Sequence, residues 1–166
     1  MAYELNKLKI LLVDDDSSMR FLVRDLLKAF GVGDIQTAND GQAAYQALRS
    51  YAADIVIADW VMKPMNGLEF LQKVRNEPDS PNPFVPMIML TGYTDIDRVM
   101  ACRNAGVTSY LAKPITPETL YKRIVSVIED KRPFVRTDNY FGPDLGDATP
   151  VAVAPTEGES DAVFEI

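Results

Sequence analysis

Five side chains that can handle a charged ligand each follow a short apolar run of the sequence. Asp14 and Asp15 follow LKILLV, Asp59 follows DIVIA, Thr91 follows MIML, and Lys113 comes shortly after VTSYL. Ligands of open α/β sheets gather where the strands end, at the carboxyl edge. If the apolar runs are parallel strands, we expect these five side chains to share one site.

Such a site favours a metal ion and phosphoryl chemistry. Two carboxylates about 4 Å apart repel by about 4 kcal/mol at an effective dielectric near 20, so three acids together require a raised pKa or a cation. Without histidine or paired cysteine, Mg²⁺ is the first choice and Mn²⁺ can substitute. A carboxylate beside the metal can attack phosphorus in line and form an acyl phosphate, while Lys113 and Thr91 bind the other oxygens.

Each of these residues also has an ordinary interpretation when taken alone. Asp14, Asp15 and Asp16 are compatible with helix-capping acids after a strand, and we expect Asp16 to be a neighbour of the site or a cap rather than a metal ligand. Lys113 alone fits a surface cation, and Cys102 fits plain packing. Only the combination of all five positions favours a phosphoryl site.

Strand-like and helix-like segments alternate along the chain. We expect strands at residues 8–13, 34–38, 54–58, 87–90 and 107–111, because these runs are short and apolar. Apolar residues at helical spacing predict helices at 19–30, 39–48, 68–75, 94–105 and 116–128. Gly31 ends the first helix, Asn39 with Gln42 predicts a capping box for the second, Thr94 caps the fourth, and Thr116 with Pro117 opens the last.

This alternation predicts a doubly wound α/β fold with five βα units, in which helices cover both faces of a parallel sheet. Residues 77–86 contain four prolines and are expected to form a loop. The helical and strand periods end near residue 132. We expect residues 133–166 to be an acidic extension, largely disordered beyond about 142, with Phe134, Tyr140 and Phe141 docking its first part.

Composition excludes several classes of protein. The chain has 166 residues, 18.5 kDa and 47% apolar residues, enough for about one domain with a sizeable core. It contains no histidine, which excludes a Ser/His/Asp triad, a zinc site with His and a phosphohistidine. With one cysteine, no membrane-length apolar run and no signal-like N-terminus, a cytoplasmic, soluble protein is expected.

The charge is divided unevenly between the body and the C-terminal end. Residues 1–136 contain 17 Lys+Arg and 17 Asp+Glu, whereas residues 137–166 contain none and 7. Nucleic acids and anionic membranes both require clustered Lys or Arg. We therefore expect no nucleic acid and no membrane among the partners. The acidic end is either a solvating appendage or a tether that contacts the partner or shields a binding face.

Five motifs in this order resemble the receiver domain of bacterial two-component response regulators, of the stand-alone chemotaxis-regulator type. They are VDDD, SSMR, DWVMKPMNG, MLTGYT and SYLAKP, and the resemblance covers about residues 7–131. It implies a flavodoxin-like sheet with strand order 2-1-3-4-5 and a receiver domain over residues 1–132.

The resemblance also assigns roles to individual residues. It implies that Asp59 accepts a phosphoryl group from a histidine kinase, a phosphotransfer protein or a small phosphodonor. It implies that Asp14, Asp15 and Asp59 hold Mg²⁺ together with the backbone carbonyl of Val61. Thr91 and Lys113 then match the hydroxyl and the amine that contact the phosphoryl group.

A switch and an output face follow from the same resemblance. Thr91 is drawn toward the phosphoryl group and leaves space for Tyr110, the switch aromatic, which alone would be interpreted as a core residue. The population shift repacks the face made by residues 94–105, 107–111 and 116–131, where a downstream protein binds. Such a protein is a signalling domain and catalyses only its own phosphorylation and dephosphorylation.

The sequence departs from the family in the loop after Asp59 and beside the expected phosphoryl group. Lys63 stands where proline is common, and Pro64 follows it. Val61 and Tyr93 are bulky, which predicts restricted access of water and slow dephosphorylation.

Two other functions stay open at this stage. An aspartate-nucleophile phosphohydrolase uses Asp, Thr, Lys and Mg²⁺ on a similar sheet, but it normally needs a second acid two residues after its nucleophile. Here that position is Val61. The other alternative is a phosphorylation-independent scaffold that keeps the pocket without using it.

Overall fold

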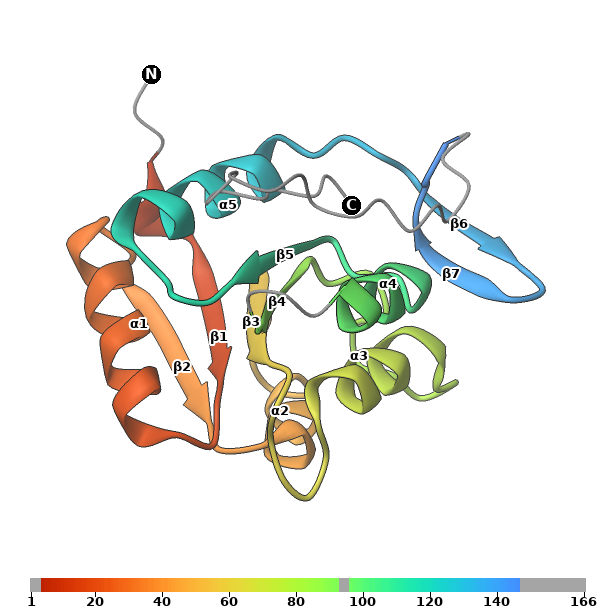
Figure 1. Cartoon of the computed structure of the whole chain (residues 1–166), viewed down its shortest axis with the longest axis horizontal. Helices are drawn as coiled ribbons and strands as arrows, with labels where there is room; N and C mark the ends of the chain where they lie inside the picture. The colour runs from red at the N-terminus through yellow and green to blue at the C-terminus, as the bar shows by residue number, and fades with distance from the viewer. Residues whose placement is uncertain (1–3, 93–95, 147–166) are drawn as a thin grey trace.

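The structure is a computed structural model that describes residues 4–92 and 96–146. A parallel sheet forms the centre of the molecule, and helices cover both of its faces (Figure 1). The strands are β1 (Lys9–Val13), β2 (Asp34–Ala38), β3 (Ile55–Asp59), β4 (Met87–Thr91), β5 (Ser109–Ala112), β6 (Phe134–Thr137) and β7 (Tyr140–Pro143). The helices are η1 (Leu5–Lys7), α1 (Ser17–Ala29), α2 (Gly41–Ala47), α3 (Gly67–Asn76), α4 (Ile96–Asn104) and α5 (Pro117–Glu129).

The central sheet confirms the predicted fold class and strand order. Its five strands are parallel and lie in the order β2-β1-β3-β4-β5. In register, Val13 stands opposite both Ala38 and Ala58, and Thr91 stands opposite Ala112. The carboxyl ends of β1, β3, β4 and β5 therefore meet at one edge of the sheet.

Alternate residues of each strand enter two separate cores. Leu11, Val56 and Met89 lie in the core beneath α2, α3 and α4. Ile10 and Ile57 lie in the other, beneath α1 and α5. Both faces of the sheet are buried, which explains why its central strands appear in the sequence as continuous apolar runs.

Capping residues start the helices largely where the sequence predicts. The Asp16 carboxylate accepts hydrogen bonds from the amides of Ser18 and Met19, which confirms it as the cap of α1. Thr116 forms a capping box with Thr119 at the start of α5. Thr94, the predicted cap of the fourth helix, lies outside the described residues.

The predicted capping box of the second helix is wrong by one residue. The cap of α2 is Asp40, whose carboxylate accepts a hydrogen bond of 2.8 Å from the amide of Ala43. Asp40 has the extended backbone that a cap requires, with φ −161° and ψ 173°. The helix therefore begins at Gly41 and not at the residue after Asn39.

An antiparallel hairpin follows α5 where the sequence periods predict no strand. β6 and β7 pair from Phe134 opposite Pro143 to Thr137 opposite Tyr140. Phe134 and Phe141 pack edge to face on Phe84 of the proline-rich loop, with ring centroids 5.3 and 5.4 Å away. This packing confirms that aromatic side chains dock the first part of the extension.

Among the described residues, no helix has the length and apolar character needed to cross a membrane.

Candidate phosphoryl-acceptor site

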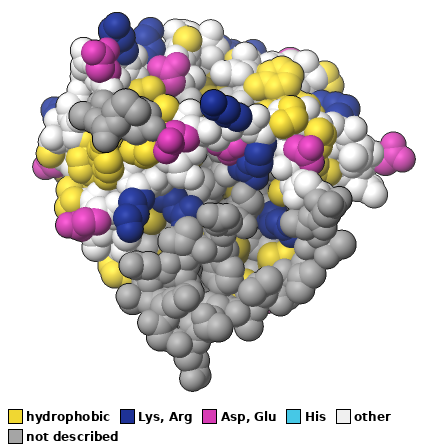
Figure 2. Space-filling model, turned by 90° about the horizontal axis from the view of Figure 1, so that it is seen from above, with side chains coloured by type: hydrophobic (Ala, Val, Ile, Leu, Met, Phe, Trp, Pro, Cys, Tyr) yellow, Lys and Arg dark blue, Asp and Glu magenta, His cyan; other side chains and the backbone are white. Residues whose placement is uncertain are grey.

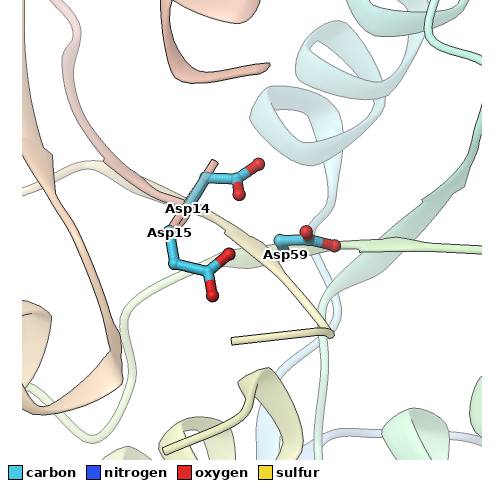
Figure 3. A group of neighbouring side chains, drawn as sticks. All are labelled: Asp14, Asp15 and Asp59. Carbon is cyan, nitrogen blue, oxygen red and sulfur yellow. The ribbon is translucent and has the colours of Figure 1, made fainter. Parts of the chain in front are cut away.

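Three carboxylates meet at the carboxyl edge of the sheet, as the sequence predicts. Asp14 and Asp15 follow β1, and Asp59 is the last residue of β3 (Figure 3). Each offers an oxygen, and these oxygens lie within 4.8 Å of one another. Asp14 and Asp59 are buried, whereas Asp15 is exposed. The cluster therefore has an exposed member in Asp15.

Asp14 is held in place by its own backbone and by the start of α1. Its Oδ1 accepts a hydrogen bond of 2.9 Å from the amide of Asp16, and its carbonyl oxygen accepts one of 2.8 Å from Nη1 of Arg20. Its Oδ2 is buried and has no hydrogen-bond partner among residues 4–92 and 96–146. No sequence pattern predicts this contact of Arg20, although one turn of α1 is enough to bring the side chain back to the end of β1.

Burial and negative charge make Asp14 an unusual acid. Burial is the largest cause of a pKa raised from 3.8 to about 6, and the neighbouring carboxylates of Asp59 and Asp15 raise it further. The hydrogen bond from the amide of Asp16 and the charge of Lys113 act in the opposite direction. A charged Asp14 therefore costs free energy in the metal-free protein.

Lys113 follows β5, and its side chain faces Asp59 at the end of β3. Its Nζ lies 3.0 Å from Oδ1 and 3.1 Å from Oδ2 of Asp59. The Lys113 amide donates to the carbonyl of Thr91 at 2.9 Å, which fixes the residue at the sheet edge, and the bond to Pro114 is cis. The carboxylate of Asp59 thus lies between a cation and two further acids.

A close approach of the backbone fixes the loop that carries Asp59. The Gly67 amide donates to the carbonyl of Trp60 at 2.8 Å. A Cβ at Gly67 would overlap the carbonyl oxygen of Asp59 and would lie 2.6 Å from Sδ of Met89. Only glycine fits at this position, a constraint that the sequence analysis did not assign.

The two proposed switch residues occupy neighbouring strands. Thr91 ends β4 and is 1% exposed, and its hydroxyl has no partner in the described parts of the chain. Tyr110 lies in β5 within the core beneath α4 and is 2% exposed. The guanidinium carbon of Arg123 lies 5.6 Å from the centre of its ring.

The remaining site positions lie in the loop after β3. Val61 is 56% exposed, and Trp60 is half-buried with the guanidinium carbon of Arg98 5.4 Å from its ring centre. The Lys63–Pro64 bond is cis. Tyr93, the other bulky position named by the sequence, lies outside the described residues.

The residues present fit a hard divalent cation. Oxygen is the only donor type in the cluster, and the buried Oδ2 of Asp14 has no protein partner in the described structure. Mg²⁺ and Mn²⁺ prefer carboxylate and carbonyl oxygens, and they usually retain water ligands. The exposed side at Asp15 leaves room for such water.

Comparison with known proteins connects this geometry to a family. The response regulator receiver domain family matches residues 10–125 of the chain. The chain is 35% identical over 126 residues to the chemotaxis protein CheY-3 of Vibrio cholerae serotype O1, covering 75% of this chain and 95% of that protein. It is 36% identical over 122 residues to the chemotaxis protein CheY1 of Helicobacter pylori, covering 73% and 97%.

Solved structures give the same result. The chemotaxis protein CheY4 of Vibrio cholerae aligns with a TM-score of 0.66 at 36% identity, covering 72% of this chain and 98% of that one. A putative response regulator from Chloroflexus aurantiacus aligns with a TM-score of 0.68 at 29% identity, covering 75% and 100%. Both alignments cover nearly the whole length of the other chain, which leaves about a quarter of this one unmatched.

Proposed function

The chain belongs to the response regulator receiver domain family of two-component signalling, and we propose that it accepts a phosphoryl group on Asp59. The position of Asp59 carries the proposal. Its carboxylate is 4% exposed and lies between Lys113 and the acids Asp14 and Asp15. Among the described residues, Asp59 is the carboxylate that forms an ion pair with Lys113.

The proposed transfer step uses Asp59 and Lys113 of this site and a phosphohistidine of the donor protein. A carboxylate oxygen of Asp59 forms a bond to phosphorus as the phosphorus–nitrogen bond of a phosphohistidine breaks, and the leaving imidazole takes a proton from water. The Lys113 ammonium compensates the negative charge that arrives. Positioning and charge compensation account for most of such catalysis.

Mg²⁺, with Mn²⁺ as its substitute, is the proposed cofactor. Asp14, Asp15, Asp59 and the carbonyl of Val61 would hold it. Bound there, the ion supplies charge neutralisation for the carboxylates and the phosphoryl oxygens. The raised pKa of Asp14 supports this proposal, because burial and the neighbouring carboxylates make the charge of Asp14 unfavourable and a cation would compensate that charge.

Signal output is proposed to use Thr91 and Tyr110. The buried hydroxyl of Thr91 has no partner in the described structure and is the nearest group of β4 to the acceptor edge, so a phosphoryl oxygen offers it a hydrogen bond. Movement of Thr91 would open space for Tyr110 on the α4 side of β5. The proposed output face comprises residues 94–105, 107–111 and 116–131.

We propose a histidine kinase or phosphotransfer protein as the donor and a downstream protein as the target, in the cytoplasm. The bulky Val61 remains a proposed cause of slow dephosphorylation. Replacing it in the variant Val61→Asn, Tyr93→Glu should accelerate the loss of label.

The decisive experiment combines labelling with the single tryptophan. Mg²⁺ and then beryllofluoride or labelled acetyl phosphate are titrated against the emission of Trp60, which neighbours Asp59. We expect about one bound phosphoryl group per chain, dependent on Mg²⁺, and an emission change on each addition. Asp59→Asn should abolish labelling, whereas the matched control Asp25→Asn, on the exposed side of α1, should not.

Two outcomes contradict the proposal. Labelling that persists in Asp59→Asn removes Asp59 as the acceptor. Many phosphates released per chain indicate a phosphohydrolase instead. If Asp59 is labelled but the affinity for the downstream protein is the same with and without phosphorylation, Asp59 remains the acceptor and the phosphorylation-independent scaffold is favoured.

A further inference from the structure

Arg20 reaches the acidic cluster through a backbone carbonyl. Its Nη1 donates a hydrogen bond of 2.8 Å to the carbonyl oxygen of Asp14. Within residues 4–92 and 96–146, the guanidinium of Arg20 forms no ion pair with a carboxylate. An arginine bound to the carboxylates would compete with a metal ion for their oxygens, whereas the contact with the carbonyl leaves those oxygens available.

The start of α1 directs this side chain toward the end of β1. The carboxylate of Asp16 caps the helix, and the carbonyl oxygen of Asp16 accepts a hydrogen bond of 3.0 Å from the amide of Arg20. Helical side chains lean toward the N-terminus of their helix. The first turn of α1 therefore carries the half-buried side chain of Arg20 back to the acids that follow the strand.

The position of Asp15 depends on its backbone. Its side chain is exposed and has no hydrogen bond or ion pair within the described parts of the chain. The peptide group before Asp15 carries the carbonyl that Arg20 binds. The peptide group after it carries the amide of Asp16, which donates to Oδ1 of Asp14 at 2.9 Å. Hydrogen bonds thus hold both peptide groups that flank Asp15, and the Arg20 side chain supplies one of them.

Long-range electrostatics do not give Arg20 a special role. Residues 1–136 contain 17 Lys+Arg and 17 Asp+Glu, so the body of the chain has no net charge. Figure 2 shows Lys, Arg, Asp and Glu side chains interspersed on the face seen from above Figure 1. Interactions between exposed charges are also largely screened beyond about 8 Å at physiological ionic strength. What distinguishes Arg20 from other cations of the surface is therefore its hydrogen bond to Asp14.

The charge and the hydrogen bond of Arg20 predict opposite effects on a bound cation. Because like charges repel, removing the charge alone would strengthen the binding of Mg²⁺. Removing the hydrogen bond would free the peptide group between Asp14 and Asp15 and weaken the binding. A hydrogen bond from a charged donor is about twice as strong as a neutral one, so its loss is a substantial change. The sign of the change in affinity therefore distinguishes the two roles.

We propose that Arg20 is a positioning residue of the metal site. Its hydrogen bond to the carbonyl of Asp14 orients the carboxylate of Asp15 toward the site that both acids share with Asp59. Arg20 does not itself bind the ion. The proposal rests on the Mg²⁺ site proposed above, and groups that orient metal ligands in this way contribute about 10- to 100-fold to metal affinity.

The magnesium affinity of the full chain tests this role. Mg²⁺ is titrated against the emission of Trp60 in wild type, in Arg20→Gln and in the matched control Arg24→Gln, which removes the same charge one turn further along α1. The dissociation constant should rise about 10-fold in Arg20→Gln and should not rise in Arg24→Gln. If Arg20→Gln does not fold, Arg20→Lys replaces it, and a smaller rise is expected because one donor remains.

Two further measurements show whether Arg20 acts through the backbone beside Asp15. In the Asp15→Asn background, Arg20→Gln should raise the dissociation constant less than about 3-fold, because both substitutions affect one interaction. In EDTA, hydrogen exchange of the Asp16 amide should be faster in Arg20→Gln than in wild type and unchanged in Arg24→Gln. The exchange measurement requires no metal ion.

An unchanged or lower dissociation constant in Arg20→Gln would overturn the proposal, as would an equal rise in Arg24→Gln. An undiminished rise in the Asp15→Asn background, or unchanged exchange of the Asp16 amide, would also overturn it. Labelling of Asp59, measured on the same proteins, is a separate readout. If wild type binds Mg²⁺ but is not labelled, the acceptor function is refuted and the role of Arg20 stands on the titration. If wild type is labelled but Arg20→Gln binds Mg²⁺ equally well, the role of Arg20 alone is refuted.

Discussion

Replacing Asp14 with asparagine should stabilise the metal-free protein at neutral pH. The carboxylate is 0% exposed, and burial together with Asp59 and Asp15 raises its pKa from 3.8 to about 6. At about 1.4 kcal/mol per pH unit, this shift corresponds to about 3 kcal/mol of unfavourable free energy when Asp14 is charged. Asparagine keeps the size and the Oδ1 acceptor but weakens the hydrogen bond from Asp16, so we expect a net gain of about 2 kcal/mol.

The stability gained by Asp14→Asn should increase as the pH rises. Because the pKa of Asp14 is higher in the folded state, folding favours its protonated form, and the penalty is absent below pH 3.8. The free-energy penalty of a charged Asp14 grows as the pH rises from 3.8 and is complete above about 6. Wild type and Asp14→Asn should therefore unfold at similar urea concentrations near pH 4 and diverge by pH 7.5.

Saturating Mg²⁺ should make wild type more stable than Asp14→Asn at neutral pH. A ligand present at 100 times its dissociation constant stabilises the folded state by about 2.7 kcal/mol, and only wild type retains all three carboxylates. Urea unfolding with EDTA, at pH 4 and pH 7.5, and with saturating Mg²⁺ at pH 7.5 measures these differences. A variant that is less stable than wild type in EDTA at pH 7.5 would refute the electrostatic reasoning.

Three further substitutions test the parts of the molecule around this cluster. Gly67→Ala should destabilise the fold by about 1–3 kcal/mol in urea unfolding and reduce labelling, because its Cβ overlaps the carbonyl oxygen of Asp59; unchanged labelling would contradict this. Lys113→Met should weaken beryllofluoride binding about 10- to 100-fold in a fluorescence titration, since a charge-assisted contact contributes about 1.5–3 kcal/mol, and unaltered binding would exclude that contact. Phe141→Ala removes a ring packed on Phe84 and should accelerate amide exchange in residues 134–143 without loss of labelling; unchanged exchange would show that the ring does not hold the hairpin.

The site residues could be located from the sequence because parallel strands bury both faces. Each of the apolar runs before Asp14, Asp59 and Thr91 ends where the chain leaves the sheet, so the first polar residue marks the carboxyl edge. Their convergence then follows from topology alone. The distances within the site and the burial of each side chain do not follow from topology, and the burial of Asp14 is what raises its pKa.

Local chemistry was less informative where two residues compete for one role. Asn39 and Asp40 are both good helix caps, and the sequence pattern of a box with Gln42 favoured the wrong one. Which residue caps depends on the backbone that follows β2, because the strand ends at Ala38 and leaves Asp40 in the extended conformation. The close approach at Gly67 is hidden for the same reason, since it depends on where Asp59 lies in space.

The hairpin was missed because its stabilising contacts come from distant parts of the chain. Its two-residue connection, Asp138 and Asn139, lacks the glycine that marks the favoured hairpin turns, and the short strands have no apolar alternation. Phe84 and the proline-rich loop provide the surface on which Phe134 and Phe141 pack. The sequence of residues 134–143 therefore has no periodic pattern that would predict this packing.

A buried arginine shows that the hairpin and the receiver share one packing unit. Nε of Arg75 in α3 donates to the carbonyl of Gly106 at 2.9 Å, and Nη1 donates to Pro83 at 2.9 Å. The ring centre of Phe134 lies 4.9 Å from its guanidinium carbon, and burial lowers the pKa of Arg75 to about 10. Because a buried guanidinium without these partners would cost several kcal/mol, α3, the proline-rich loop, the turn before β5 and the hairpin must be placed together. The same turn leads into the strand of Tyr110, so the position of the hairpin constrains the proposed switch strand.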